Sequence, residues 1–416
     1  MKRAPAVLGL LAGLLGLGST GSHAAEQDFV TIQRGRYLAT VGDCISCHTA
    51  PGGIPFAGGR PLETPFGTLV TPNLTPDPAT GLGNWTDAEF LRAMREGIGR
   101  GGKRLYPALP YSYYTKATRD DLLAIKAYLA TLNPVVNPVQ VNQLPFPFSI
   151  RFSMWGWNML FFTPGEYRAV AAKSAEWNRG AYLVEGLGHC GACHTPRNSL
   201  GGENTTAAFS GGTLIGWHAP NLGRDLRTGI GGWSAEDIVE YLKTGRNQRS
   251  AASGPMAEVV YFSTQHMTDA DLKAIATYLK DLPAVTPAVS AAPPLAETDP
   301  VMVAGKAIYL DNCSACHVSS GAGVPRMFPA LRGNAVVQAP DGSTLVRVIT
   351  QGVRAASTAT APTAPAMPPF DWKLNDEQTA AVLTYIRNAW GNAAPAVSPS
   401  LVSSLKRNLS PDGATP

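Results

Sequence analysis

The pentapeptide Cys44-Ile-Ser-Cys47-His48 recurs as Cys190-Gly-Ala-Cys193-His194 and as Cys313-Ser-Ala-Cys316-His317. These copies contain all six cysteines of the 416-residue chain. In a Cys-x-x-Cys-His string the two thiols form thioethers with the vinyl groups of a c-type haem, and the histidine binds the iron. The sequence therefore predicts three covalently bound haem c groups, attached at Cys44, Cys47, Cys190, Cys193, Cys313 and Cys316, with His48, His194 and His317 as proximal iron ligands.

Two other interpretations of paired cysteines fit this sequence poorly. A structural zinc site takes its thiolate or imidazole ligands in groups of four, whereas these thiols form three separate pairs. A thioredoxin-type redox pair requires no histidine directly after its second cysteine. An electron-transfer protein is the interpretation that accounts for every cysteine.

The regions around the haem motifs are internal repeats. Gly35-Arg-Tyr-Leu38 and Gly180-Ala-Tyr-Leu183 precede the first two motifs, and a looser version, Gly305 to Leu310, precedes the third. Pro72-Asn-Leu74 and Pro220-Asn-Leu222 follow the first two motifs, and in both a tryptophan stands 12 residues after the asparagine. Similarity at fixed spacing indicates a duplicated domain rather than shared composition.

Each repeat ends in an expected helix with apolar residues at helical spacing, as in Leu122, Ile125 and Leu129. A terminal helix that crosses the helix before the haem motif resembles class I cytochrome c. We therefore expect a mainly α fold of three tandem class I cytochrome c domains. The residues expected to cap helix N-termini, each with an acidic residue three positions later, are Thr86, Thr118, Ser234 and Thr268; Asn375 is expected to open the last helix of the third repeat.

Composition divides the chain into haem domains and linkers. The segment after the first repeat is rich in aromatic residues, and we expect it to pack between the first two domains; the alternative is contact with another subunit or with a membrane surface. The segment after the second repeat is rich in Pro and Ala and is expected to be extended. The predicted parts are a signal peptide at 1–24, haem domains at 26–133, 177–281 and 301–392, linkers at 134–176 and 282–300, and a flexible tail at 393–416.

The first residues have the pattern of an export signal. Lys2 and Arg3 precede an apolar run over residues 7–17, and Ser22-His-Ala24 ends with small residues, which predicts cleavage after Ala24. A retained anchor would need about 20 apolar residues, and this run is shorter and broken by glycines. We therefore expect a periplasmic protein, with no other membrane span. The net charge of +4 comes from dispersed residues, so no nucleic-acid partner is expected.

The second iron ligand of a class I haem is usually a methionine sulfur. Met256 and Met367 lie in proline-bracketed segments after the second and third motifs, and both are predicted distal ligands in loops. In the first repeat Leu109 occupies this position and cannot bind iron, so the first haem is either five-coordinate or takes a methionine from elsewhere. The candidates for that role are Met94, Met154 and Met159; Met267 and Met327 are rivals of the two predicted ligands and are expected to be packing residues.

Four strings carry a resemblance to a known family: 42–49, Leu105-Tyr-Pro-Ala-Leu-Pro-Tyr111, 179–197 and 242–246. Together they resemble the three-haem cytochrome c subunits of periplasmic membrane-bound dehydrogenases, in which methionine is usual at the position of Leu109. The resemblance implies a non-catalytic subunit on the outer face of the inner membrane. Its electrons would come from a quinoprotein, flavoprotein or molybdenum hydroxylase subunit that oxidises an alcohol, aldehyde, sugar or N-heterocycle, and would pass to ubiquinone or a terminal oxidase.

Two other function classes remain as alternatives. An open first haem beside Leu109 would suit a haem enzyme or a gas-binding protein, although catalytic distal pockets use polar groups and this string is apolar and aromatic. A free multihaem electron shuttle is the other alternative. The Gly-x-Gly-x-x-Gly string from Gly97 to Gly102 follows an expected helix, not a strand, which argues against dinucleotide binding.

Overall fold

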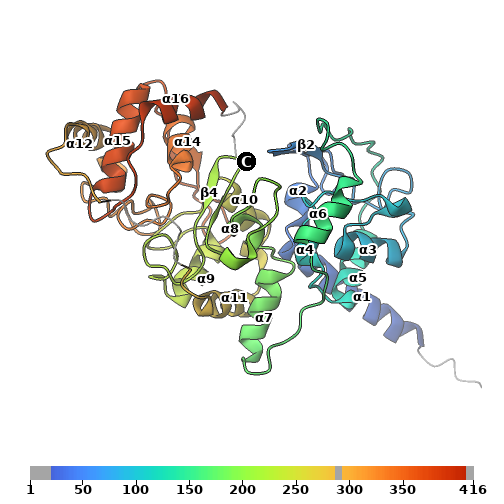
Figure 1. The fold of residues 1–416 in the computed structure, drawn as a ribbon. Helices are drawn as coiled ribbons and strands as arrows, with labels where there is room; N and C mark the ends of the chain where they lie inside the picture. Colours follow the sequence, from blue (N-terminus) through green and yellow to red (C-terminus); the bar gives the residue numbers. More distant parts are fainter. Residues whose placement is uncertain (1–19, 286–292, 409–416) are drawn as a thin grey trace, which may run out of the picture.

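The computed structural model describes residues 20–285 and 293–408, which form three helical domains in sequence order (Figure 1). The predicted fold class, mainly α with three tandem cytochrome c domains, is confirmed. The predicted signal peptide lies outside the described residues except for residues 20–24, which are part of the first helix. No helix among the described residues is long and apolar enough to cross a membrane.

In the first domain the haem motif stands, along the sequence, between two long helices that cross each other. α1 precedes the motif, α5 ends the domain, and these two helices pack against each other. A short antiparallel hairpin, which the sequence analysis did not predict, follows the motif. The elements are α1 (Thr20–Val41), α2 (Cys44–Cys47), β1 (Pro61–Thr64), β2 (Gly67–Val70), α3 (Asp87–Glu96), η1 (Arg100–Gly102), α4 (Tyr111–Tyr114) and α5 (Arg119–Leu129).

The second domain repeats this order, with α7 packed against α11. It is joined to the first domain by a linker that contains α6 (Ser153–Phe161). Its elements are α7 (Ala175–Glu185), α8 (Gly191–His194), η2 (Thr205–Ala207), β3 (Gly212–Leu214), β4 (Trp217–Ala219), α9 (Ala235–Thr244), α10 (Pro255–Phe262), η3 (Thr264–His266) and α11 (Asp269–Asp281).

The third domain has its own apolar core, around α12 and α15. Residues 399–408 are not a flexible tail, because they form a helix whose Val402 is fully buried and whose Leu405 packs against this core. The remaining residues of the predicted tail, 409–416, lie outside the described part. The elements are α12 (Pro300–Asn312), α13 (Ser314–His317), α14 (Ser343–Gln351), β5 (Val353–Arg354), β6 (Ala366–Met367), α15 (Asp376–Asn388) and α16 (Pro399–Asn408).

A glycine stands at each of the three helix crossings. A Cβ atom at Gly35, Gly180 or Gly305 would lie 1.8, 2.0 or 2.2 Å from a backbone carbonyl oxygen of the opposing helix. Only glycine allows the two backbones to approach this closely. The repeated glycine of the sequence thus fixes the same helix pairing in all three domains.

The predicted helix starts are confirmed. In each case the capping side chain accepts a hydrogen bond from the backbone N–H three residues later, which satisfies a donor that has no partner inside the helix. Thr86, Ser234 and Asn375 form complete capping boxes, and Thr118 and Thr268 accept the single bond.

The aromatic linker divides its apolar side chains between the interior and solvent. Trp157 donates its indole N–H to the carbonyl oxygen of Leu200 at 3.0 Å, and Phe161 packs against Gly202. Phe152 and Met159, from the same segment, are 73% and 69% exposed. Packing between the first two domains therefore accounts for only part of this aromatic surface.

Candidate haem-binding sites

The proximal histidine of the first domain is held in one tautomer. Nδ1 of His48 lies 2.8 Å from the carbonyl oxygen of Pro72. Because a carbonyl oxygen can only accept, Nδ1 carries the proton and donates it, and Nε2 keeps its free lone pair. An iron ligand needs this tautomer, and the outer hydrogen bond also fixes the orientation of the ring.

The other two domains repeat the arrangement. Nδ1 of His194 donates to the carbonyl oxygen of Pro220 at 2.7 Å, and Nδ1 of His317 donates to that of Pro329 at 3.0 Å. Burial lowers the pKa of His194 to about 4 and also lowers the pKa of His48 and of His317. All three rings are therefore neutral at physiological pH, as metal ligation requires.

The cysteines have the properties of attachment residues rather than of reactive thiols. All six are free, and none forms a disulfide. Burial raises the pKa of the Cys44 and Cys190 thiols to about 12 and that of Cys313 to about 11. Redox-active and metal-binding cysteines have lowered pKa values that favour the thiolate. The donor set fits covalent haem c and does not fit thioredoxin-type chemistry.

The two predicted distal methionines lie in different local structures. Met367 is half-buried in β6 against the core of the third domain. Met256 is in the first turn of a helix, not in a loop, because Pro255 opens α10 at a position that suits proline. Of the two rival residues, Met267 is a buried core residue as expected, whereas Met327 is 50% exposed and is not a packing residue.

Comparison with known proteins matches this geometry. The family described as cytochrome c matches residues 32–133, 178–283 and 302–390, each with one haem motif. The chain belongs to the cytochrome c family. It is 40% identical to the cytochrome c subunit of a quinone alcohol dehydrogenase from Gluconobacter oxydans (strain 621H), over 96% of this chain and 87% of that protein.

Two further relatives are subunits of the same kind. The cytochrome c subunit of gluconate 2-dehydrogenase from Pantoea cypripedii is 38% identical over 97% of this chain and 95% of its own length. The cytochrome subunit of fructose dehydrogenase from Gluconobacter japonicus is 37% identical over 90% and 82%. The predicted resemblance to dehydrogenase cytochrome c subunits is confirmed, and covalently bound haem c follows from the family.

In the first domain of this cytochrome c, a leucine stands at the predicted distal position. Leu109 is half-buried and packs against the apolar core. Met94 is buried in that same core, and Met154 is half-buried on α6. Met159 is 69% exposed and does not belong to this core.

The helix that carries the predicted distal ligand of the second domain packs against the haem-attachment helix of the first. α10, which carries Met256, contacts α2. Arg60 joins these two helices, since its guanidinium donates to the carbonyl oxygen of Ser46 on α2 at 2.6 Å and pairs with Glu258 on α10 at 2.9 Å. A charged side chain of one domain thus holds the distal helix of its neighbour.

The contact is reciprocal. Tyr113 on α4, just after Leu109, lies against the attachment helix α8, where a Cβ at Gly191 would be only 2.5 Å from the Tyr113 hydroxyl oxygen. That hydroxyl donates to Glu203 of the second domain at 2.6 Å. In the first two domains, each distal segment therefore touches the other domain's attachment helix.

Six polar side chains complete this pseudo-twofold junction, and we call them the reciprocal network. Within each domain an arginine pairs with the aspartate that stands three residues after the N-cap of the last helix. A tyrosine of the other domain donates a hydrogen bond to the same aspartate. Although burial acts to raise the pKa of Asp271, its hydrogen bonds with Arg179 and Tyr37 hold that pKa below its ordinary value. The contacts are Arg34–Asp121 (2.6 Å), Tyr182–Asp121 (2.5 Å), Arg179–Asp271 (2.8 Å) and Tyr37–Asp271 (2.6 Å).

The proline carbonyls that orient the histidines are functional residues that the sequence analysis missed. Pro72 and Pro220 stand in strings that it used only as evidence of duplication. The signal was available in the asparagine that follows, because Oδ1 of Asn73 accepts from the backbone N–H of Thr75 at 2.9 Å and closes the turn that presents the carbonyl. In the third domain the same position is held by Pro329 without the asparagine.

Proposed function

We propose that this cytochrome c is a three-haem subunit that takes electrons from a separate dehydrogenase catalytic subunit and passes them to ubiquinone or a terminal oxidase. The observation that carries the proposal is the threefold occurrence of a Cys-x-x-Cys-His helix whose histidine Nδ1 donates to a proline carbonyl. Haem c, when bound, supplies reversible one-electron redox chemistry. The relatives support the dehydrogenase partner, since all three named above are cytochrome subunits of dehydrogenases.

In this proposal the chain's own residues bind and orient the cofactors. Each cysteine pair forms two thioethers, and Nε2 of the following histidine binds the iron. Met256 and Met367 supply the distal sulfur in the second and third domains, which stabilises the reduced iron and raises its potential. The half-buried Leu109 leaves the first domain without that ligand.

The catalytic partner would be a quinoprotein, a flavoprotein or a molybdenum hydroxylase that oxidises an alcohol, aldehyde, sugar or N-heterocycle. The complex would work in the periplasm, at the outer face of the inner membrane. The export pattern of residues 1–24 supports this placement.

Intact mass spectrometry tests the number of haems. The secreted chain, cut after Ala24, should exceed its polypeptide mass by three haem groups. A Cys-to-Ser pair at Cys313 and Cys316 should remove one haem and leave two. A parent protein that carried only two haems would overturn the three-haem assignment.

Rapid mixing tests the electron-transfer role. When the purified complex receives the substrate of its catalytic subunit, the haem absorption of this subunit should shift to the reduced form, and addition of a ubiquinone analogue should reoxidise it. Met256→Ala and Met367→Ala should each lower one reduction potential while the haem content stays intact. Haems that stayed oxidised through substrate turnover would refute the proposal.

The haem-enzyme alternative is not favoured by the structure around the first distal position. The aromatic side chains beside Leu109 already use their hydroxyl groups, since Tyr111 donates to Asn158 at 2.6 Å and Tyr113 donates to Glu203 at 2.6 Å. A catalytic distal pocket needs polar groups free to contact a ligand.

A further inference from the structure

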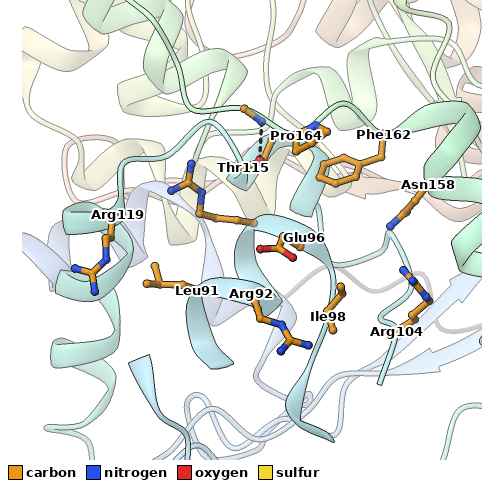
Figure 2. A pocket seen from close by; sticks show the side chains of 12 residues that line it. Leu91, Arg92, Glu96, Ile98, Arg104, Thr115, Arg119, Asn158, Phe162 and Pro164 are labelled. Carbon is orange, nitrogen blue, oxygen red and sulfur yellow. Dashed lines mark hydrogen bonds between the residues drawn. The ribbon is translucent and has the colours of Figure 1, made fainter. Parts of the chain in front are cut away.

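A cavity of about 730 Å³ lies between α3, the start of α5 and the linker that joins the first two domains. Figure 2 shows Phe162 and Pro164 of the linker on one side of this cavity and Leu91 of α3 on the other. Four arginines line the cavity, and among the described residues Glu96 is the only acidic one in the lining. A volume of about 300–1,000 Å³ is usual for a small-molecule site. The lining arginines are Arg92, Arg95, Arg104 and Arg119.

Hydrogen bonds hold the linker wall of the cavity in place. The backbone N–H of Gly165 donates to the hydroxyl oxygen of Thr115 at 3.1 Å, which is the dashed line in Figure 2. At the other end of the wall, the Tyr111 hydroxyl donates to Asn158 at 2.6 Å. Because both ends of the wall are attached to the first domain, the cavity is formed before any ligand arrives.

The second domain shows how the duplicated sequence balances charge at the equivalent place. α9 corresponds to α3, because both helices begin with a capping box and end at a left-handed glycine after the same number of residues. In this alignment Glu240 takes the position of Arg92. Arg326 of the third domain donates to Oε2 of Glu240 at 3.3 Å, so the charge on α9 is neutralised there. The first domain carries the opposite charge at this position.

The last helices of the two domains, aligned at the threonines that cap them, differ in the same way. Asp269 of the second domain corresponds to Arg119, and Lys243 corresponds to Arg95. Lys243 pairs with Asp269 at 3.2 Å. The first domain has two arginines in place of this ion pair, so an attraction in one copy is replaced by a repulsion in the other.

The arginines of the cavity are therefore left short of negative charge. Arg95 pairs with Glu166 at 3.3 Å. No ion pair within residues 28–285 and 293–408 includes Arg92, Arg104 or Arg119. Like charges around one cavity repel one another, and an anion between them removes that repulsion. Guanidinium groups also bind carboxylate and phosphate oxygens through charge-assisted and often bidentate hydrogen bonds.

We propose that this cavity binds a small organic anion that carries carboxylate or phosphate groups. Its oxygens contact the arginines, and its carbon atoms pack against the apolar side chains of Leu91, Ile98 and Phe162. The cavity favours a small molecule over an acidic protein segment, because a protein partner contacts a broad surface of about 800 Å² on each side. None of the predicted haem-attachment or iron-binding residues lines this cavity, so the site goes beyond the electron-transfer function.

Isothermal titration calorimetry of the haem-loaded mature chain tests this, with citrate and pyrophosphate as probes in chloride buffers of matched ionic strength. The parent should bind one molecule of at least one probe, and the tighter probe identifies the acidic group that the site prefers. Arg92→Gln and Arg104→Gln should each weaken that binding about tenfold, because each removes one charge-assisted hydrogen bond. The matched control is Arg36→Gln, which changes an exposed arginine of α1 outside the cavity and should bind like the parent.

A second test gives the first domain the residue type of the second. Arg119→Asp should supply Arg95 with a carboxylate partner and thereby replace the anion. A probe at 100 times the dissociation constant of the parent should raise the unfolding temperature of the parent by about 5–10 °C, and that of the variant by no more than about 2 °C. Each protein is compared with its own probe-free value, so a change in intrinsic stability does not affect the result.

Two results would overturn the proposal. The first is that the parent binds neither probe at matched ionic strength, and the second is that Arg92→Gln, Arg104→Gln and Arg119→Asp bind the probes as the parent does. If, in addition to either result, these variants no longer co-purify with the dehydrogenase subunit, the arginines belong to a protein interface instead. Neither the probes nor the readouts involve electron transfer, so failure here leaves the proposed function untouched, and the converse also holds.

Discussion

Gly305→Ala should destabilise the third domain, because the glycine lies where α12 crosses α15. A Cβ atom there would be 2.2 Å from the carbonyl oxygen of Ala381 and 2.7 Å from the Cβ of Tyr385. Both partners belong to a buried helix, so no flexible side chain can move aside. The two helices would have to separate by about 1 Å, and a gap of that size forfeits a quarter to a half of each contact's dispersion energy.

We expect Gly305→Ala to lower the free energy of unfolding of the third domain by about 2 kcal/mol. Overpacking a well-packed core costs about 1–3 kcal/mol, and a clash with a rigid backbone belongs at the upper end. The higher helix propensity of alanine offsets about 1 kcal/mol of this cost, because glycine destabilises the interior of a helix relative to alanine. For a domain of this size, 2 kcal/mol lowers the unfolding temperature by about 10 °C.

Differential scanning calorimetry of the haem-loaded chain measures the effect, since it separates the transitions of several domains. Gly156→Ala is the matched control: it is also a glycine inside a helix, but no atom lies within 4 Å of its would-be Cβ. The control should be neutral or slightly stabilising. If Gly305→Ala unfolded at the temperature of the parent or above it, the close crossing inferred from the structure would be wrong.

Three further substitutions test the haem sites and the domain junction. Leu109→Met should convert an open first haem to a low-spin form and raise its potential, which electron paramagnetic resonance and redox titration measure; an unchanged spectrum would mean that another ligand already binds. Asp271→Asn should flatten the loss of stability below about pH 4, because the lowered pKa of Asp271 gives stabilisation that is complete above the ordinary carboxylate pKa and is lost as the pH falls through the lowered value. Urea midpoints across pH measure this, with the 86%-exposed side chain of Asp269, changed to Asn, as control. Arg60→Met should lower at least one haem potential without loss of haem, because it removes a positive charge between α2 and α10 and leaves Glu258 unpaired; a titration identical to that of the parent would contradict the bridging role.

The sequence was sufficient where the interactions are local. The haem motifs are five-residue strings, and the caps at Thr86 and Asn375 involve residues three positions apart. The glycine of each crossing was visible as a repeat, because the same close approach is built three times. In these cases the residue type and its immediate neighbours determine the structure.

The sequence was insufficient where a residue's partner is distant in the chain. Nothing near Pro72 shows that its carbonyl accepts from a histidine 24 residues earlier. The sequence predicts a flexible tail that includes residues 399–408, but these residues form a helix that packs against α14 and α15. The division of the aromatic linker into packed and exposed sides likewise depends on α6 meeting residues near Leu200, about 40 positions later.

The pairing of the first two domains, and the exclusion of the third, can nevertheless be explained from sequence once the reciprocal network is known. The network needs an arginine just before the crossing glycine, a tyrosine two residues after it, and an aspartate three residues after the cap of the last helix. At the corresponding positions around Gly305 the third domain has Ala304 and Ala307, and after its cap it has Gln378. It therefore has neither the arginine and tyrosine donors nor the carboxylate that such a junction uses.

This difference also explains the two apolar cores. The first and second domains share one buried cluster, because the network and the reciprocal distal contacts hold their faces together. The third domain buries its own cluster and covers it with α16, whose Val402 is fully buried. Its contact with the second domain is made instead through scattered polar pairs such as Thr213–Asp341 at 2.9 Å and through a small cluster that includes Met256 and Ala356. The two domains that keep the arginine, the tyrosine and the aspartate pack against each other. The third domain lacks these residues and is joined to the second only by the smaller contacts named above.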